Sequence, residues 1–178
     1  MTHFTKPLLL LAFMALPATA AEFNLGLNDD VVAAELIAPI AKNANAGINY
    51  IYGDDEGYLL QATTHVTHDA GVHHMEFGLQ YSQLWSLTSP DGNMLAIGGR
   101  YAVDLGSKLS WHAAGYYTPS VLAFGKLDGH YEADTKVQYD LTPQLGFYVG
   151  YRYMRFKYER VADNTFDSSF YLGMKVRF

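Results

Sequence analysis

Hydrophobic and polar residues alternate along most of this chain, and the alternation is clearest over residues 166–178. One set of alternate positions there is mainly apolar: Phe166, Ser168, Phe170, Leu172, Met174, Val176 and Phe178. The positions between them are mainly polar: Asp167, Ser169, Tyr171, Gly173, Lys175 and Arg177. Successive side chains of a β-strand point to opposite faces. The pattern therefore predicts a strand with one apolar face and one polar face.

The same two-residue period recurs upstream. It is strong in 73–85, 95–105, 109–117, 130–141 and 145–153, and weaker in 22–28, 31–38, 46–52 and 58–66. Clusters of Gly, Pro, Asn and Asp separate these segments, as expected of turns. The pattern predicts ten antiparallel strands, with eight as the alternative because the first segments are short.

The chemistry of the two faces distinguishes a membrane barrel from a soluble β-sandwich. A soluble sandwich buries its apolar faces, whereas a transmembrane barrel turns them toward lipid and lines its lumen with polar side chains. The apolar faces carry aromatic residues near the strand ends, as interfacial girdles do: Tyr101, Trp111, Tyr139, Tyr151, Tyr153 and Phe178. We predict an all-β, transmembrane, antiparallel up-and-down barrel over residues 21–178, and a soluble periplasmic sandwich is the competing fold.

An even number of strands would place both ends of the barrel on the periplasmic side. The periplasmic turns would then be 39–45, 68–71, 104–108 and 141–144. The external connections would be 28–30, 53–57, 86–93, 118–129 and 159–166. The longer connections of the C-terminal half all fall outside, as membrane barrels prefer.

Residues 1–20 have the features of a cleaved secretory signal peptide. Lys6 precedes an apolar run from Pro7 to Leu16, which is shorter than the roughly 20 residues of a membrane-spanning helix. Ala18-Thr19-Ala20 then supplies a small-x-small cleavage site. We expect export by the general secretory route and insertion into the outer membrane of a Gram-negative cell envelope.

The last segment carries a spacing that suggests an assembly signal. Gly173, Val176 and Phe178 resemble the C-terminal pattern that the barrel-assembly machinery reads in outer-membrane proteins. That machinery is therefore an expected partner during biogenesis. Outer-membrane lipids and lipopolysaccharide are the expected surroundings of the finished barrel.

Composition removes several other classes of function. The chain has 178 residues, no cysteine and a formal net charge of −6. A thiolate metal site and a cysteine nucleophile are thus excluded, and an acidic chain without a Lys/Arg cluster is a poor nucleic-acid binder. Glycine-rich nucleotide loops are absent, and the sequence indicates no cofactor.

Several stretches resemble the YfaZ family of small outer-membrane proteins. They are 23–31 (FNLGLNDDV), 52–57 (YGDDEG), 97–101 (IGGRY), 116–122 (YYTPSVL), 149–153 (VGYRY) and the end at Phe178. The resemblance covers nearly the whole chain after residue 20. It implies a small barrel in the outer membrane, and it carries over no functional residue.

The polar faces place acids and bases together in the expected lumen. The set comprises Glu35, Glu76, Arg100, Asp104, Glu132, Asp134, Lys136, Arg152, Lys175 and Arg177. The interior of a small barrel is just wide enough for side chains, and unpaired buried charge is costly. We therefore expect these groups to pair and plug the lumen, with a thin water path as the alternative.

Two smaller groups could carry chemistry. A tight turn at 69–71 would bring His65 and His74 nearly opposite each other, with Glu76 nearby, and such a set can hold zinc; a hydrogen-bonded histidine is the favoured reading. Ser110 and His112 share a strand face and could form a nucleophile–base pair if an acid oriented the histidine. They are expected in the lumen near the periplasmic end, which is the wrong leaflet for lipid A, so ordinary lumen polarity is the favoured interpretation. No residue is therefore assigned as catalytic.

The sequence favours a non-enzymatic, structural or envelope-associated barrel with a charge-paired lumen. A narrow channel for small solutes is the first alternative. A lipid-modifying outer-membrane enzyme is the second.

Overall fold

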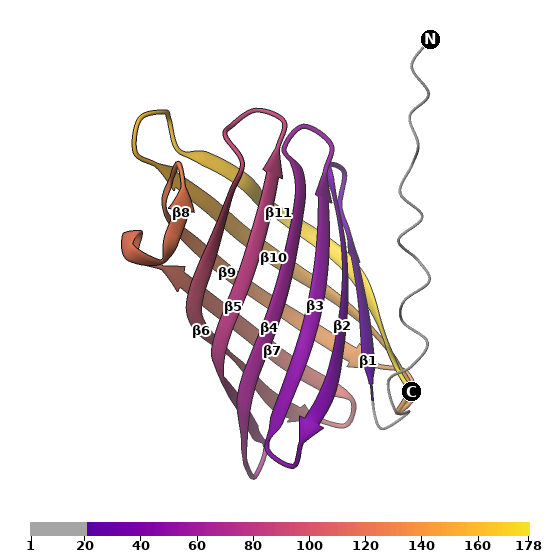
Figure 1. The fold of residues 1–178 in the computed structure, drawn as a ribbon. Coiled ribbons are helices and arrows are strands. Elements are labelled where there is room, and N and C mark those ends of the chain that lie inside the picture. The colour runs from indigo at the N-terminus through magenta and orange to yellow at the C-terminus, as the bar shows by residue number, and fades with distance from the viewer. Residues whose placement is uncertain (1–20) are drawn as a thin grey trace.

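The computed structural model describes residues 21–178, so the expected signal peptide lies outside the described residues. Within them, ten strands form one closed antiparallel barrel (Figure 1). The wall strands are β1 (Glu22–Leu27), β2 (Val31–Ala41), β3 (Ala44–Gly53), β4 (Gly57–Ala70), β5 (His73–Ser86), β6 (Gly92–Gly106), β7 (Leu109–Thr118), β9 (Leu127–Asp140), β10 (Leu145–Tyr158) and β11 (Asn164–Arg177). The ten-strand prediction is confirmed, and the eight-strand alternative is wrong.

Closure occurs between the first and last strands. β1 pairs with β2 on one side and with β11 on the other, from Glu22↔Arg177 to Leu27↔Leu172. A closed sheet leaves no edge whose backbone N–H and C=O groups would face lipid unpaired. The competing sandwich is wrong, because one continuous sheet closes on itself and no second sheet lies against it.

The outer surface of this barrel is apolar. Large hydrophobic side chains alternate outward along the strands and are strongly exposed, as at Phe77 (67%), Leu172 (68%) and Phe170 (74%). Aromatic pairs also lie on this surface, including Tyr101 with Trp111, whose ring centroids are 5.9 Å apart. Exposed apolar surface of this extent suits lipid rather than water. The prediction that the apolar faces point outward is confirmed.

Among residues 21–178, no helix has the length and apolar character needed to cross a membrane.

The two ends of the barrel differ in the length of their connections. Three connections at the end where β1 begins are two residues long: 42–43, 71–72 and 107–108. The opposite end carries 28–30, 54–56, 87–91, 119–126 and 159–163. Membrane barrels have short periplasmic turns and longer external loops. The end where β1 begins is therefore the periplasmic end.

The external connection between β7 and β9 is more ordered than a loop. It contains a short 3₁₀ helix, η1 (Ser120–Leu122), and a strand, β8 (Ala123–Gly125). β8 pairs with β6 at Gly92–Met94, just beyond the residues of β6 that pair with β7. β8 thus takes the place of β7 beside the external part of β6, after the intervening residues at η1 have left the wall (Figure 1). The predicted connection over 118–129 is too long, since β9 already begins at Leu127.

The expected outward position of Phe166 is also wrong. Met154 pairs with Asp167, but the next residue, Arg155, pairs with Thr165, so Phe166 is an extra residue in β11. Such a bulge moves a side chain to the other face of the sheet. Phe166 consequently lies inside the barrel with 2% exposure.

A pair of glycines allows close packing of the wall at β5 and β6. Gly78 and Gly98 are direct cross-strand partners. A Cβ at Gly98 would lie 2.2 Å from the carbonyl oxygen of Gly115, and one at Gly78 would lie 1.9 Å from that of Thr64. No side chain fits at either position without moving the backbone of a neighbouring strand.

We predict that Gly98→Ala destabilises the barrel by about 2 kcal/mol or more, because the added methyl group overpacks against backbone. The measurement is urea unfolding of the refolded protein in detergent, read from the difference in gel migration between unheated and boiled samples. Gly115→Ala is the matched control, since its added Cβ meets nothing closer than 3.9 Å. Equal stability of the two variants would show that the wall is not close-packed at Gly98.

Candidate functional site in the barrel lumen

The external half of the lumen is filled by apolar side chains. We call this cluster the apolar plug; it consists of Val31, Ala33, Ile51, Leu59, Leu84, Met94, Leu127, Met154, Phe156, Tyr158 and Phe166. Its members come from eight of the ten wall strands, so the cluster crosses the full width of the lumen. Six of them, including Phe156, are completely buried, at 0% exposure. The rings of Phe156 and Phe166 meet edge to face, with centroids 5.9 Å apart.

Sequence reasoning missed this plug. The expected lumen was polar throughout, and the strand expected at 145–153 ended before the plug begins. The inward positions of β10 change from Arg152 to Met154, Phe156 and Tyr158. β4 and β5 show the same change, from Gln61 to Leu59 and from Ser82 to Leu84. Tracking the inward positions to the end of each strand would have revealed it.

The periplasmic half of the lumen holds a polar cavity of about 710 Å³. Its lining runs from Lys42 and Arg177 near the periplasmic rim to Gln80 and Glu132 beneath the plug. The residues of the expected lumen charge set line this cavity, among them Glu76, Arg100, Glu132, Asp134, Lys136, Arg152, Lys175 and Arg177. Glu35 and Asp104 line it as well.

An ion pair crosses the middle of the lumen. Arg100 on β6 binds Glu35 on β2, and three strands separate these two along the wall. The Nε of Arg100 also donates to the Tyr116 hydroxyl at 3.1 Å. Both charged side chains are about one-fifth exposed, to the cavity. The pair thus ties together opposite sides of the barrel.

A second crossing lies directly beneath the plug. Glu132 on β9 accepts hydrogen bonds from the side-chain amides of Gln61 on β4 (2.9 Å) and Gln80 on β5 (2.8 Å). His130 Nε2 lies 3.6 Å from the same carboxylate, and the His130 ring stacks on Phe156 with centroids 5.0 Å apart. Glu132 therefore lies at the boundary between the polar cavity and the apolar plug. Its carboxylate is hydrogen-bonded by two side-chain amides rather than by a lysine or an arginine.

The histidines expected near one another both contact Glu76. His74 Nε2 lies 3.0 Å from one carboxylate oxygen and His65 Nδ1 lies 3.6 Å from the other. They are not cross-strand partners, because the turn falls at 71–72 and pairs His65 with Gly78. His65 is further held by Tyr116 at 2.8 Å. Within residues 21–178 no group of three or more potential ligands is placed to hold a metal ion.

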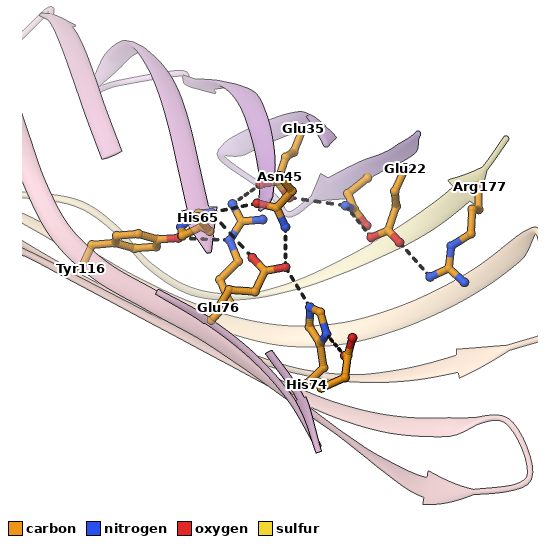
Figure 2. A network of polar contacts seen from close by, with 11 residues as sticks. Glu22, Glu35, Asn45, His65, His74, Glu76, Tyr116 and Arg177 are labelled. Atoms are coloured by element: carbon orange, nitrogen blue, oxygen red, sulfur yellow. Dashed lines mark hydrogen bonds and ion pairs between the residues drawn. The ribbon is translucent and has the colours of Figure 1, made fainter. Parts of the chain in front are cut away.

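These contacts join into one polar chain across the barrel (Figure 2). One arm runs from Arg177 through Glu22 and Asn24 to Glu35 and Arg100. The other continues from Tyr116 through His65, Asn45 and Glu76 to His74 and Asp69. The chain takes residues from eight wall strands. It therefore braces the periplasmic half of the lumen as the plug fills the external half.

The remaining lumen charges are paired only in part. Arg152 lies 3.6 Å from both Asp134 and Asp167. Lys175 lies 3.0 Å from Asp140. Lys136 makes no ion pair within the described chain and instead lies 4.5 Å above the Tyr148 ring. Water in the cavity can solvate this ammonium group.

The sequence matches the model of the YfaZ family, described as "YfaZ precursor", over residues 4–178. The chain belongs to the YfaZ family. The word "precursor" agrees with the expected leader sequence. A search of curated proteins finds no match.

Solved structures with a similar fold are outer-membrane porins and channels. The KdgM porin has a TM-score of 0.49 at 12% identity, over 90% of this chain and 99% of that one. The NanC porin has a TM-score of 0.47 at 8% identity, over 89% and 97%. The channel DcaP of Acinetobacter baumannii has a TM-score of 0.33 at 12% identity, over 83% and 62%. At these levels the likeness concerns the fold alone.

Ser110 and His112 of this YfaZ-family barrel form a direct contact. The Ser110 hydroxyl and His112 Nε2 are 2.9 Å apart on the lumen side. Among residues 21–178, no carboxylate hydrogen-bonds to His112, so the orienting acid of a nucleophile–base–acid site is not in place.

The residues of the expected assembly signal lie on β11 and just beyond it. Gly173 faces the lumen against the Tyr148 ring, where an added Cβ would lie 2.1 Å from a ring carbon. Val176 faces outward, and Phe178 is 72% exposed. Their role in recognition by the assembly machinery stays a prediction.

We predict that Glu35→Gln lowers the free energy of unfolding by about 2 kcal/mol. This loss is smaller than the loss expected on breaking a fully buried ion pair, because the Arg100 side chain is about one-fifth exposed to the cavity. The change leaves the Arg100 charge without its partner. The measurement is urea unfolding in detergent micelles. Glu22→Gln is the control: it breaks the more exposed rim pair with Arg177 and should cost about 1 kcal/mol or less. A larger loss from the rim variant would contradict the bracing role of the central pair.

Proposed function

We propose that this protein is a non-enzymatic, envelope-associated outer-membrane barrel whose lumen is closed to solute flow in the resting state. The observation that carries the proposal is the apolar plug, which crosses the lumen above the charged cavity. An ion that entered a dry apolar constriction would lose its hydration without compensation. The polar cavity then forms a pocket that is accessible from the periplasm.

The polar contacts below the plug support the same proposal. Arg100 with Glu35 and Glu132 with Gln61 and Gln80 all reach across the lumen, so they narrow any path before the plug is met. Charged side chains that satisfy one another resist being pulled apart, because a separated partner would remain buried and uncompensated. These crossings favour a stable closed interior.

A narrow channel for small solutes is the second candidate. The cavity of about 710 Å³ already occupies the periplasmic half of the lumen, so displacement of the plug would extend this space toward the external side. An apolar constriction of this kind can act as a gate that opens by wetting.

We propose no catalytic role, since Ser110 and His112 lack an orienting carboxylate within the described residues. We further propose that the protein reaches the outer membrane by the secretory route and that the barrel-assembly machinery inserts it. Nucleic acid is not a proposed partner.

We predict that the wild-type barrel shows no stable conductance steps in a planar lipid bilayer, whereas Leu84→Ser/Phe156→Ser conducts. The two changes widen the plug and make it wettable, because they replace completely buried apolar side chains with small polar ones. Single-channel recording at symmetric salt measures the outcome.

The matched control is Phe170→Ser/Leu172→Ser, which changes the same residue types on the lipid-facing side of β11. It should remain silent. Steady conductance of the wild type would instead support the channel candidate. A folded, protease-resistant plug variant that stays silent would show that the plug is not the seal.

A further inference from the structure

Charge is distributed unevenly on the outer wall of the barrel. Along the regularly alternating parts of the ten wall strands, the outward positions hold apolar, aromatic or neutral polar side chains, with histidine at 68 and 73. Within the described residues, the two outward-facing side chains with a permanent charge are Arg155 and Lys157. Both are cations on β10, two positions apart, so they are neighbours on the same face. Asp128 lies at a register shift of β9 and does not follow the alternation.

The position of these cations matches the level of the external headgroups. β10 ends at Tyr158 and enters the external connection 159–163. A lipid-facing cation is costly at the bilayer midplane and costs little near the interfaces. Lys157 also lies in an aromatic setting typical of the interface: its Nζ is 4.7 Å above the Tyr131 ring and donates to the Tyr131 hydroxyl at 3.1 Å. Tyr117 packs beside Tyr131, with ring centroids 5.1 Å apart.

Both cations keep unused hydrogen-bond donors. Asp163 accepts one bond from Nη2 of Arg155 at 2.9 Å, and the Arg155 side chain remains 43% exposed. A guanidinium carries five N–H donors and an ammonium three. The Asp163 and Tyr131 contacts therefore hold the two side chains in place without exhausting their donors. A group with several anionic oxygens can bridge them.

We propose that Arg155 and Lys157 form a binding site for a phosphate group of a glycolipid in the external leaflet of the outer membrane. Phosphate suits this pair because arginine can bind it bidentately while lysine supplies a point charge. The acyl chains of the same lipid would lie along the apolar wall below, where Tyr151 and Phe170 pack with ring centroids 5.1 Å apart. This site does not depend on whether the lumen conducts.

The test measures binding of phosphorylated and dephosphorylated lipid A to the folded full-length barrel in detergent micelles by native mass spectrometry. The wild type should bind the phosphorylated form about tenfold more tightly, as expected for two cations near a membrane surface. Arg155→Gln/Lys157→Gln should abolish this preference. Lys42→Gln/Lys108→Gln removes the same charge from the periplasmic turns and should retain it.

Equal binding of the two lipids by the wild type would overturn the proposal. So would a retained preference in the Arg155/Lys157 variant, or an equal loss in the periplasmic control. Asp163→Asn tests the site by a gain rather than a loss of binding. It therefore remains informative if the double variant does not fold. Because it frees Arg155 from a competing carboxylate, it should strengthen binding of phosphorylated lipid A about threefold; unchanged or weaker binding would count against the site.

Discussion

Pairing of the backbone groups of the wall is the constraint on which the rest of this structure depends. Lipid offers no hydrogen bonds to an open edge, so the sheet must close. Closure here rests on β1, which has only six residues and pairs with β11 over residues 172–177. The external part of β11 extends beyond β1. There, side chains reach across the seam: Asn164 donates to Glu56 at 2.6 Å, and Phe166 turns inward beside Gly53.

Closure also creates an interior that must be filled, and the barrel fills its two halves with different chemistry. Toward the periplasm, acids, bases and amides form contacts that cross the lumen and surround a water-accessible cavity. Toward the outside, apolar side chains pack mainly against one another. Glu132 lies at the boundary, bound by Gln61 and Gln80 below and close to His130, which stacks on the plug. The two halves of the lumen therefore differ in polarity: one surrounds a cavity lined by charged side chains, and the other is filled by the apolar plug.

The side chains on the outer surface are likewise matched to the lipid that surrounds them. Apolar and aromatic side chains cover the region in contact with hydrocarbon. Permanent charge on this face is confined, among regularly alternating positions of the described strands, to Arg155 and Lys157 at the external rim. Solvation by lipid thus selects which side chains face outward at each depth.

The sequence by itself determined the class of fold, the apolar exterior and the lumen position of the charged residues, whereas it left ten and eight strands as alternatives that the structure decided in favour of ten. It could do so because strand alternation is local: neighbouring residues alone decide which face a side chain takes. Only the tertiary structure decided which charges meet, since Glu35 and Arg100 are 65 positions apart along the chain and become partners through barrel closure. It also decided the inward turn of Phe166, because a bulge depends on the register against β10. The apolar plug was likewise decided by the tertiary structure, because its residues form one cluster only when eight strands bring them together in the lumen.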